Sequence, residues 1–397
     1  MNRWLFLLLL AAPAAVIAET LHTPPLVPFV LAALGLIPLA GLIGMATETL
    51  AERLGPGIGG LLNATFGNAA EIIIGLTALA AGLPEVVRAS LAGSIIGNVL
   101  LVLGSAMLVG GWRYRRQQFD PRAAGQYAAM LALVVIGMAV PSLLATIGES
   151  TRPGAAVVRG NELHQLSIGI ALILLVCYAA YIAYSVFGLR ASPNDAFTVS
   201  ASPVGNGEDS QHDHSSSKVL EKETFPQYRT RTSGLMATLA IWWRTTLWLP
   251  IGVLAGVTAV TAVVSEVLVS TIEPVAHQIG LNPFFVGLII LPIVGNAAEH
   301  FSAITAANRN HMEISMAITA GSSIQIALLA APILVLAGPL IGVPLDLNFS
   351  LLEVALFGLV AGLYALISLD GESTWLEGLL LLAFYLILAV GTFFTPS

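Results

Sequence analysis

The stretch Gly-Asn-Ala-Ala-Glu at residues 67–71 decides the fold, because the same five residues recur at 295–299, an offset of 228 residues. Without gaps, fifteen of the thirty-five positions from 67 to 101 are identical at this offset. Apolar helices can match by chance at Ala and Leu, but not over a word that contains Asn and Glu. The sequence therefore predicts an internal duplication.

The residues around both copies are apolar enough to lie in a bilayer. Of 397 residues, 56% are hydrophobic and 10% are charged, whereas about 25% of the residues of a soluble domain are charged. Long hydrophobic runs recur along the chain, which is typical of membrane-spanning helices. The predicted fold class is an all-α, polytopic membrane protein with about eleven transmembrane helices: 4–18, 27–51, 60–81, 88–111, 124–145, 164–188, 247–270, 283–306, 314–337, 350–369 and 374–393.

The first segment, 1–24, has two interpretations. Arg3, a short apolar stretch and the small residues at 16–18 are compatible with a cleaved signal peptide. We favour an uncleaved short span. The orientation of the rest of the chain is the same in both cases.

Basic residues predict that orientation. With the N-terminus inside, thirteen Lys and Arg residues face the cytoplasm, and only Arg88, Arg152 and Arg159 face out. The first half, 25–190, and the second half, 241–397, then hold five spans each. Five is an odd number, so the second half enters the membrane from the opposite face. We expect two inverted five-helix repeats, as in many secondary transporters.

The segment 191–240 is the predicted cytoplasmic linker between the halves. Its part 191–232 is rich in Ser, Thr and acidic residues, and is too polar to pack in a core. His212, Asp213 and His214 could bind a regulatory metal. We favour a solvated linker with incidental histidines.

The acidic residues Glu71 and Glu299 are the strongest functional candidates. Each lies about ten residues inside an apolar span, where a charged side chain costs roughly 2.5–3.5 kcal/mol. A protonated Glu that joins helices is the structural alternative. That alternative does not explain why the neighbouring Asn and Gly are also repeated.

The surrounding side chains supply oxygen ligands. The candidate cation ligands are Glu71, Glu299, Asn68, Asn296, Ser94, Asn98, Ser322 and Gln325. Zn²⁺ and Cu²⁺ would want nitrogen or sulfur, whereas about six to eight oxygens suit Ca²⁺. Mg²⁺ is less apt because it keeps its waters. The predicted cargo is Ca²⁺, with Mn²⁺ or other divalent cations open, and we expect no resident cofactor.

The shared site also predicts coupling to protons. Two carboxylates in one site cannot both ionise cheaply without a cation, so H⁺ and Ca²⁺ compete for the same oxygens. A second acidic pair, Glu48 and Glu266, lies near opposite ends of the first span of each half. We interpret this pair as proton-relay or gating residues. Interfacial acids at helix ends are the alternative.

Other function classes find little support. Apart from the short cluster 113–116, Lys and Arg form no dense stripe, so no nucleic-acid partner is expected. An intramembrane hydrolase would need a zinc motif, paired Asp or an activated Ser, and Glu299-His300 does not form one. The single cysteine, Cys177, lies in an apolar run. A structural or receptor-like protein would not explain duplicated Asn and Glu. The chain is therefore not expected to be an enzyme, and carries no signal for an oligomeric state.

The quoted motifs resemble those of the calcium/proton exchanger (CAX) family of the cation/Ca²⁺ antiporter superfamily. Residues 60–71 are similar to the family's first repeat motif, 291–300 to its second and 321–326 to the segment after it. The resemblance implies an eleven-span fold with a separable first span and cation-binding carboxylates at Glu71 and Glu299. It also implies proton-linked roles for Glu48 and Glu266.

The resemblance leaves open the driving ion and the membrane in which the protein lies. A Na⁺-driven exchanger of the same superfamily would carry acidic residues in the spans after the motifs, where this chain has Ser94, Asn98, Ser322 and Gln325. The Ala- and Leu-rich composition and short first span favour a bacterial cytoplasmic membrane over a vacuolar one. The mixed charge of the linker does not match the acidic stretch that many family members carry there.

Overall fold

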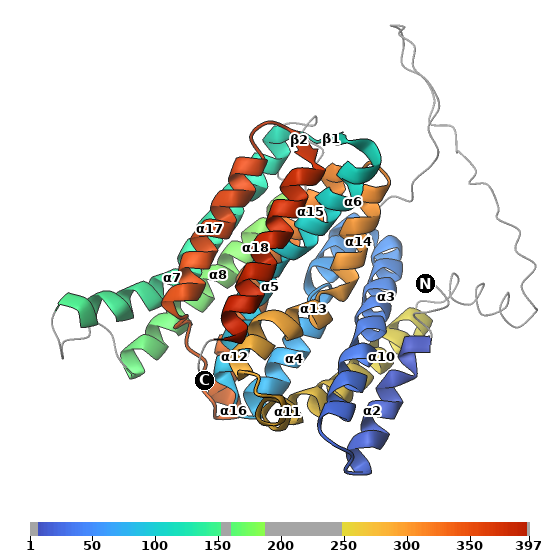
Figure 1. The fold of residues 1–397 in the computed structure, drawn as a ribbon, viewed down its shortest axis with the longest axis vertical. Coiled ribbons are helices and arrows are strands. Elements are labelled where there is room, and N and C mark those ends of the chain that lie inside the picture. Colours follow the sequence, from blue (N-terminus) through green and yellow to red (C-terminus); the bar gives the residue numbers. More distant parts are fainter. Residues whose placement is uncertain (1–6, 152–159, 187–247, 395–397) are drawn as a thin grey trace, which may run out of the picture.

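The computed structural model describes residues 7–151, 160–186 and 248–394. The predicted linker and the start of the first predicted span lie outside these ranges. The described helices form one elongated bundle, with the two short strands at one end and α11 and α16 at the other (Figure 1). Helix α2 lies beside α3 at the edge of the bundle.

The first predicted half and the segment before it contain the following elements. In chain order they are α2 (Ala11–Thr20), α3 (Leu26–Phe66), α4 (Ala69–Ala80), α5 (Pro84–Gly97), the π-helical segment η1 (Asn98–Leu103), α6 (Gly104–Tyr114), β1 (Arg116–Gln118), α7 (Pro121–Thr151) and α8 (Asn161–Val186).

The second predicted half has a similar order of helices with additional breaks, and its strand lies before the last helix. Its elements are α10 (Trp248–Ser270), α11 (Ile272–Ile279), α12 (Pro283–Phe285), η2 (Val286–Ile290), α13 (Leu291–Gly295), α14 (Ala297–Asn308), α15 (Met312–Gln325), η3 (Ile326–Ala330), α16 (Ala331–Ile341), α17 (Leu351–Ile367), β2 (Glu372–Thr374) and α18 (Trp375–Phe393).

The membrane fold is confirmed by the length and hydropathy of these helices. Seven described helices are long and apolar enough to cross a bilayer, and the bent pair Pro283–Gly295 and Ala297–Asn308 makes an eighth. Shorter apolar helices lie at the first, third and tenth predicted spans: Leu7–Thr20, Ala69–Ala80 and Leu351–Ile367. Each predicted span thus coincides with an apolar helix, while the number eleven stays a prediction.

The bounds of the helices follow the predicted duplication. Helix α14 begins and ends 228 residues after α4, and α15 begins and ends 228 residues after α5. Both α5 and α15 run directly into a π-helical segment. The packing also has matching partners: α6 lies along α18, and its counterpart α16 lies along α8. The inverted orientation of the halves stays a prediction.

Helix α3 is longer than the span predicted at 27–51, because helical backbone continues to Phe66. It cannot be straight, since a β-carbon on Gly59 would collide with the carbonyl oxygen of Ala51. Residues eight apart in a straight helix are separated by about 12 Å along its axis. The bend therefore lies between Ala51 and Gly59, and this interval contains a proline, the residue type that most often disrupts a helix. The predicted spans two and three are therefore the two arms of α3, with α4 continuing the second arm.

A small feature departs from the all-α prediction. Strands β1 and β2 pair antiparallel, with Gln117 opposite Ser373. Gln117 is buried. Its side-chain amide nitrogen, Nε2, donates to the carbonyl oxygen of Ala307 at 2.8 Å and to Oδ1 of Asn310 at 3.1 Å. The ribbon thereby holds the chain just after α14. Such three-residue strands are too short to show a period-two pattern.

Candidate cation site

Two helix breaks place the repeated motifs. Between α3 and α4 the chain passes through Asn68, and between α13 and α14 it passes through Asn296. Their backbone angles are alike, with φ/ψ of −100/19° and −88/15°, in a sparsely populated region that active-site residues often occupy. The second break bends the helix axis by 61°. Both copies of the repeated motif therefore lie at a break in the helix.

Neither asparagine caps the helix that it precedes. Asn is a favoured N-cap residue because its side chain can accept a hydrogen bond from the first turn. In this structure Asn68 and Asn296 make no such bond, although each side chain is only 1% exposed. Their amide groups are therefore turned away from the helix start and into the protein, where they are available to a ligand.

Two hydrogen bonds join the halves at this level. Asn68 donates from Nδ2 to Oε1 of Gln325 at 2.7 Å. Asn98 donates from Nδ2 to Oγ of Ser322 at 3.1 Å. Both bonds use the amide nitrogen of an asparagine, so the amide oxygen is left to point elsewhere. The structure thus brings four of the predicted ligand residues into cross-half pairs, and Ser94 is buried one helical turn before Asn98.

Five buried oxygen atoms of the predicted ligand residues have no hydrogen-bond partner in the protein. They are Oδ1 of Asn68, both carboxylate oxygens of Glu71, Oδ1 of Asn98 and Oδ1 of Asn296. A buried polar atom without a partner costs free energy, and native proteins keep few of them. A cluster of unpaired oxygens is what a dehydrated cation requires.

The carboxylates of Glu71 and Glu299 stand in the first turns of α4 and α14. The positive end of each helix dipole favours a negative group there. The carboxylate of Glu71 lies within electrostatic range of Glu299, so one carboxylate from each half is in the same region. Glu71 also lies against the opposite break, because a β-carbon on Gly295 would be 3.4 Å from its Cγ and 3.8 Å from its Oε1.

Glu48 and Glu266 are placed differently. Both side chains are exposed on the surfaces of α3 and α10, and neither makes a hydrogen bond or ion pair with the cation-site residues described above. Their neighbours Thr47 and Ser265 are fully buried, and each hydroxyl lacks a partner. The proton-relay or gating role of the two acids stays a prediction.

Sequence reasoning missed one buried hydroxyl on α10. Thr261, one turn before Ser265, is a further buried hydroxyl without a partner, and the spacing of Thr261 and Ser265 on one helix face was an available signal. Glu353 and Glu377 form capping boxes with Ser350 and Thr374. The Ser/Thr-x-x-Glu pattern before an apolar run predicts such a box. These two acids are therefore structural.

A family model described as sodium/calcium exchanger protein matches residues 25–187 and 249–394, which is well over half of the chain. The chain belongs to this family. The resemblance to calcium/proton exchangers that the motifs indicated is thereby placed in its wider family.

Relatives agree over the full length. A protein of Synechocystis sp. named Ca(2+)/H(+) antiporter is 41% identical over 394 residues, covering 99% of this chain and 98% of its own. Vacuolar cation/proton exchanger 4 of Arabidopsis thaliana is 36% identical, covering 99% of this chain and 82% of its own. The solved structure of native YfkE has 35% identity and a TM-score of 0.74, covering 99% and 100% of the two chains.

Proposed function

We propose that this protein is a secondary active transporter that exchanges Ca²⁺ for H⁺ across a membrane by alternating access. The observation that carries the proposal is the set of five unpaired buried oxygens, two of which belong to the carboxylate of Glu71, together with the carboxylate of Glu299 from the other half. The names of the full-length relatives support the same assignment. Transport, and not an enzymatic reaction, is the function that this site serves.

The oxygens fit Ca²⁺ as the cargo. Glu299 adds two carboxylate oxygens to the five unpaired ones, and about six to eight oxygens at about 2.3–2.6 Å surround a protein-bound Ca²⁺. The amide oxygens are neutral and mobile, which suits a cation that must also leave. The described residues contain no cluster of three or more His, Cys, Asp or Glu side chains. Mn²⁺ and other divalent cations are possible competing cargoes.

The carboxylates couple the cargo to protons. With Ca²⁺ bound, its charge balances two ionised carboxylates. Without a cation, two ionised carboxylates in one site repel each other, so protons bind to them in place of the cation. The site therefore changes its access from one side of the membrane to the other with either Ca²⁺ or H⁺ bound. Glu48 and Glu266 are proposed to lie on the route of those protons, because each follows a buried hydroxyl without a partner.

A Na⁺-driven exchange is the second candidate, favoured only by the name of the matching family model. The residues at issue are Ser94, Asn98, Ser322 and Gln325, which are neutral and therefore supply no further charge for a set of Na⁺ ions. For the membrane itself, the composition supports a bacterial cytoplasmic membrane. The vacuolar relative supports the alternative.

The test is ⁴⁵Ca²⁺ uptake into proteoliposomes under an imposed pH gradient, with and without Na⁺. We expect uptake that follows the pH gradient, disappears when a protonophore collapses it, and does not need Na⁺. Uptake that requires a Na⁺ gradient and ignores the pH gradient would favour the second candidate.

A further inference from the structure

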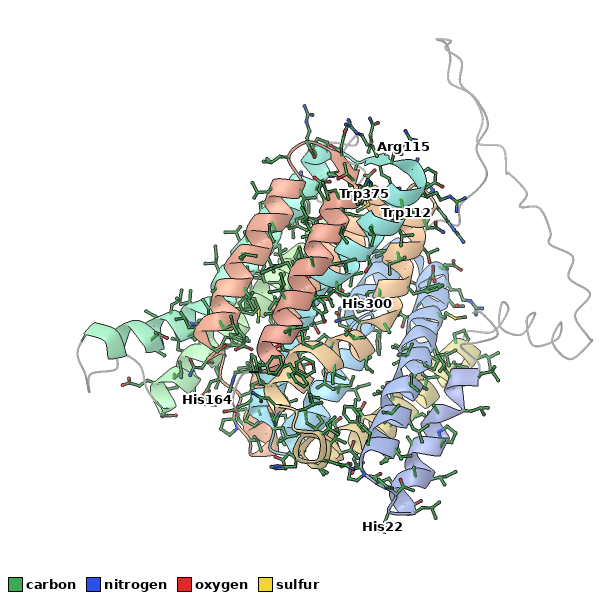
Figure 2. All side chains as sticks on the ribbon, viewed as in Figure 1. His22, Trp112, Arg115, His164, His300 and Trp375 are labelled. Carbon is green, nitrogen blue, oxygen red and sulfur yellow. The ribbon has the colours of Figure 1, made fainter. Side chains whose placement is uncertain are left out.

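The end of the bundle that carries the β-ribbon has an open groove away from the cation site. It measures about 480 Å³ and is lined by Leu108, Val109, Trp112, Arg113, Asn308, Trp375 and Leu379. These residues come from α6, α14 and α18. Figure 2 shows Trp112, Trp375 and Arg115 together at this end, far from His22 at the other.

Small residues explain why the groove forms. A β-carbon on Gly378 would lie 2.6 Å from the carbonyl oxygen of Gly104, and one on Gly111 would collide with the backbone of Trp375. The backbones of α6 and α18 therefore touch, as small residues allow in membrane helices. The larger side chains beside the contact stand outward and form apolar walls. Trp112 is 79% exposed and Trp375 43% exposed.

The rim of the groove is cationic. Arg113 is exposed at the last turn of α6, with Arg115 and Arg116 after it. Arg116 pairs with Glu372 at 3.3 Å. Arg113 instead donates a weak hydrogen bond to Oδ1 of Asn308 at 3.4 Å, and its guanidinium lies 5.6 Å from the ring centre of Tyr114. Within the described chain, this guanidinium has no acidic partner.

From this combination we propose that the groove binds an anionic phospholipid, with an acyl chain along the apolar walls and the phosphate on Arg113. Tryptophan and tyrosine favour the level of the lipid headgroups. The basic residues place this end at the cytoplasmic face, where anionic lipids attract Arg and Lys. Charge complementarity selects this occupant over a zwitterionic lipid, and the apolar walls select it over free phosphate.

The groove is also linked to the helix that carries Glu299. Asn308, which Arg113 contacts, is the last residue of α14, and the same helix begins two residues before Glu299. Tyr114 donates to the carbonyl oxygen of Asn308 at 3.2 Å. A lipid on Arg113 therefore binds beside the far end of the helix that carries one of the two site carboxylates.

Brominated lipids test the binding directly, because bromine quenches nearby tryptophan fluorescence. The purified full-length protein in neutral detergent is titrated with dibrominated phosphatidylglycerol or phosphatidylcholine. The double variant Trp112→Phe, Trp375→Phe measures quenching at all other tryptophans, which is subtracted. We expect half-saturation by the phosphatidylglycerol to come at a roughly fivefold lower concentration, the preference that one basic residue gives for an anionic lipid. Millimolar inorganic phosphate should not displace it.

Variants separate the groove from general surface charge. Arg113→Gln should remove the preference for phosphatidylglycerol, whereas Arg122→Gln, an equal loss of charge at an exposed residue outside the groove, should keep it. Val109→Phe, which narrows the groove between its apolar walls, should weaken binding of both lipids. Equal quenching by the two lipids, equal effects of the two arginine variants, or displacement by phosphate would each overturn the proposal.

Discussion

The side chain of Glu71 lies against the backbone of Gly295, so the carboxylate of one half packs on the helix break of the other. A β-carbon at residue 295 would stand 3.4 Å from Cγ of Glu71, which is ordinary van der Waals contact. The space beside this carboxylate is therefore bounded by a residue with no side chain. That space is where a cation would meet its ligands.

We predict that Gly295→Ala weakens Ca²⁺ binding without preventing folding, because the added methyl group occupies space next to Glu71. Gly295→Val should be worse, since its γ-carbons reach further. If the γ-carbons of Gly295→Val displace the carboxylate of Glu71 at a cost of about 1.4 kcal/mol, the dissociation constant for Ca²⁺ rises about tenfold in that variant. Isothermal titration of the purified protein measures it. Gly358→Ala is the control, because nothing lies within 4 Å of that added β-carbon. Unchanged affinity in Gly295→Val would place the ion elsewhere.

The bond between Asn98 and Ser322 predicts an energetic coupling between the halves. Asn98→Ala and Ser322→Ala each remove one partner of the 3.1 Å hydrogen bond. In a double-mutant cycle on the apparent melting temperature and on Ca²⁺ affinity, we expect the double variant to lose less than the sum of the singles, by about 1 kcal/mol. Strict additivity in both measurements would mean that the pair does not join the halves.

Two buried serines, Ser142 and Ser167, hold the connection from α16 to α17 by hydrogen bonds to its backbone. Oγ of Ser142 accepts from the backbone N–H of Phe349 at 2.7 Å and donates to the carbonyl oxygen of Leu347 at 3.0 Å. Ser142→Ala leaves both buried groups unpaired, at a cost of about 1–3 kcal/mol. We expect the melting temperature, followed by tryptophan fluorescence, to fall by several degrees. Thr20→Ala, which removes an exposed hydroxyl bonded within its own helix, should leave it unchanged.

Topology is tested by epitope tags. The predicted excess of thirteen basic residues over three on the inner side places the segment 191–232 in the cytoplasm and the C-terminus on the other side. A tag in that segment should be labelled only after the cytoplasmic side is opened, and a C-terminal tag should be labelled in intact cells. Labelling of both tags from one side would rule out two inverted five-helix repeats.

Much of the fold could be predicted because the membrane simplifies the sequence signal. Apolar runs indicated the spans. Helices α10 and α18 each begin one residue after the predicted spans 247–270 and 374–393 and end at the predicted residue. The repeated motif predicted an internal duplication, and both of its copies lie at a helix break. A short sequence motif is tied to a local backbone conformation, and here the same motif has the same conformation in both copies.

The pairing of the site residues could not be predicted. Asn68 meets Gln325 and Asn98 meets Ser322, and these partners are separated by 257 and 224 residues. Spacing within a helix says which residues share a face, but not how two halves dock. The π-helical segments after Gly97 and Gln325 shift the register of the helix, and no residue pattern marks that shift.

The proposed exchange requires that Glu71 and Glu299 form one shared Ca²⁺ and H⁺ site. The most direct measurement is pH-driven ⁴⁵Ca²⁺ uptake by Glu71→Gln, Glu299→Gln and the double variant in proteoliposomes, at matched amounts of inserted protein. We predict that either single change abolishes uptake and that the double variant is no worse, because each removes the charge and the exchangeable proton from the same site. Glu48→Gln and Glu266→Gln should instead shift the pH dependence or slow exchange. Near-normal, pH-dependent uptake by both single variants at the site would contradict the shared-site mechanism.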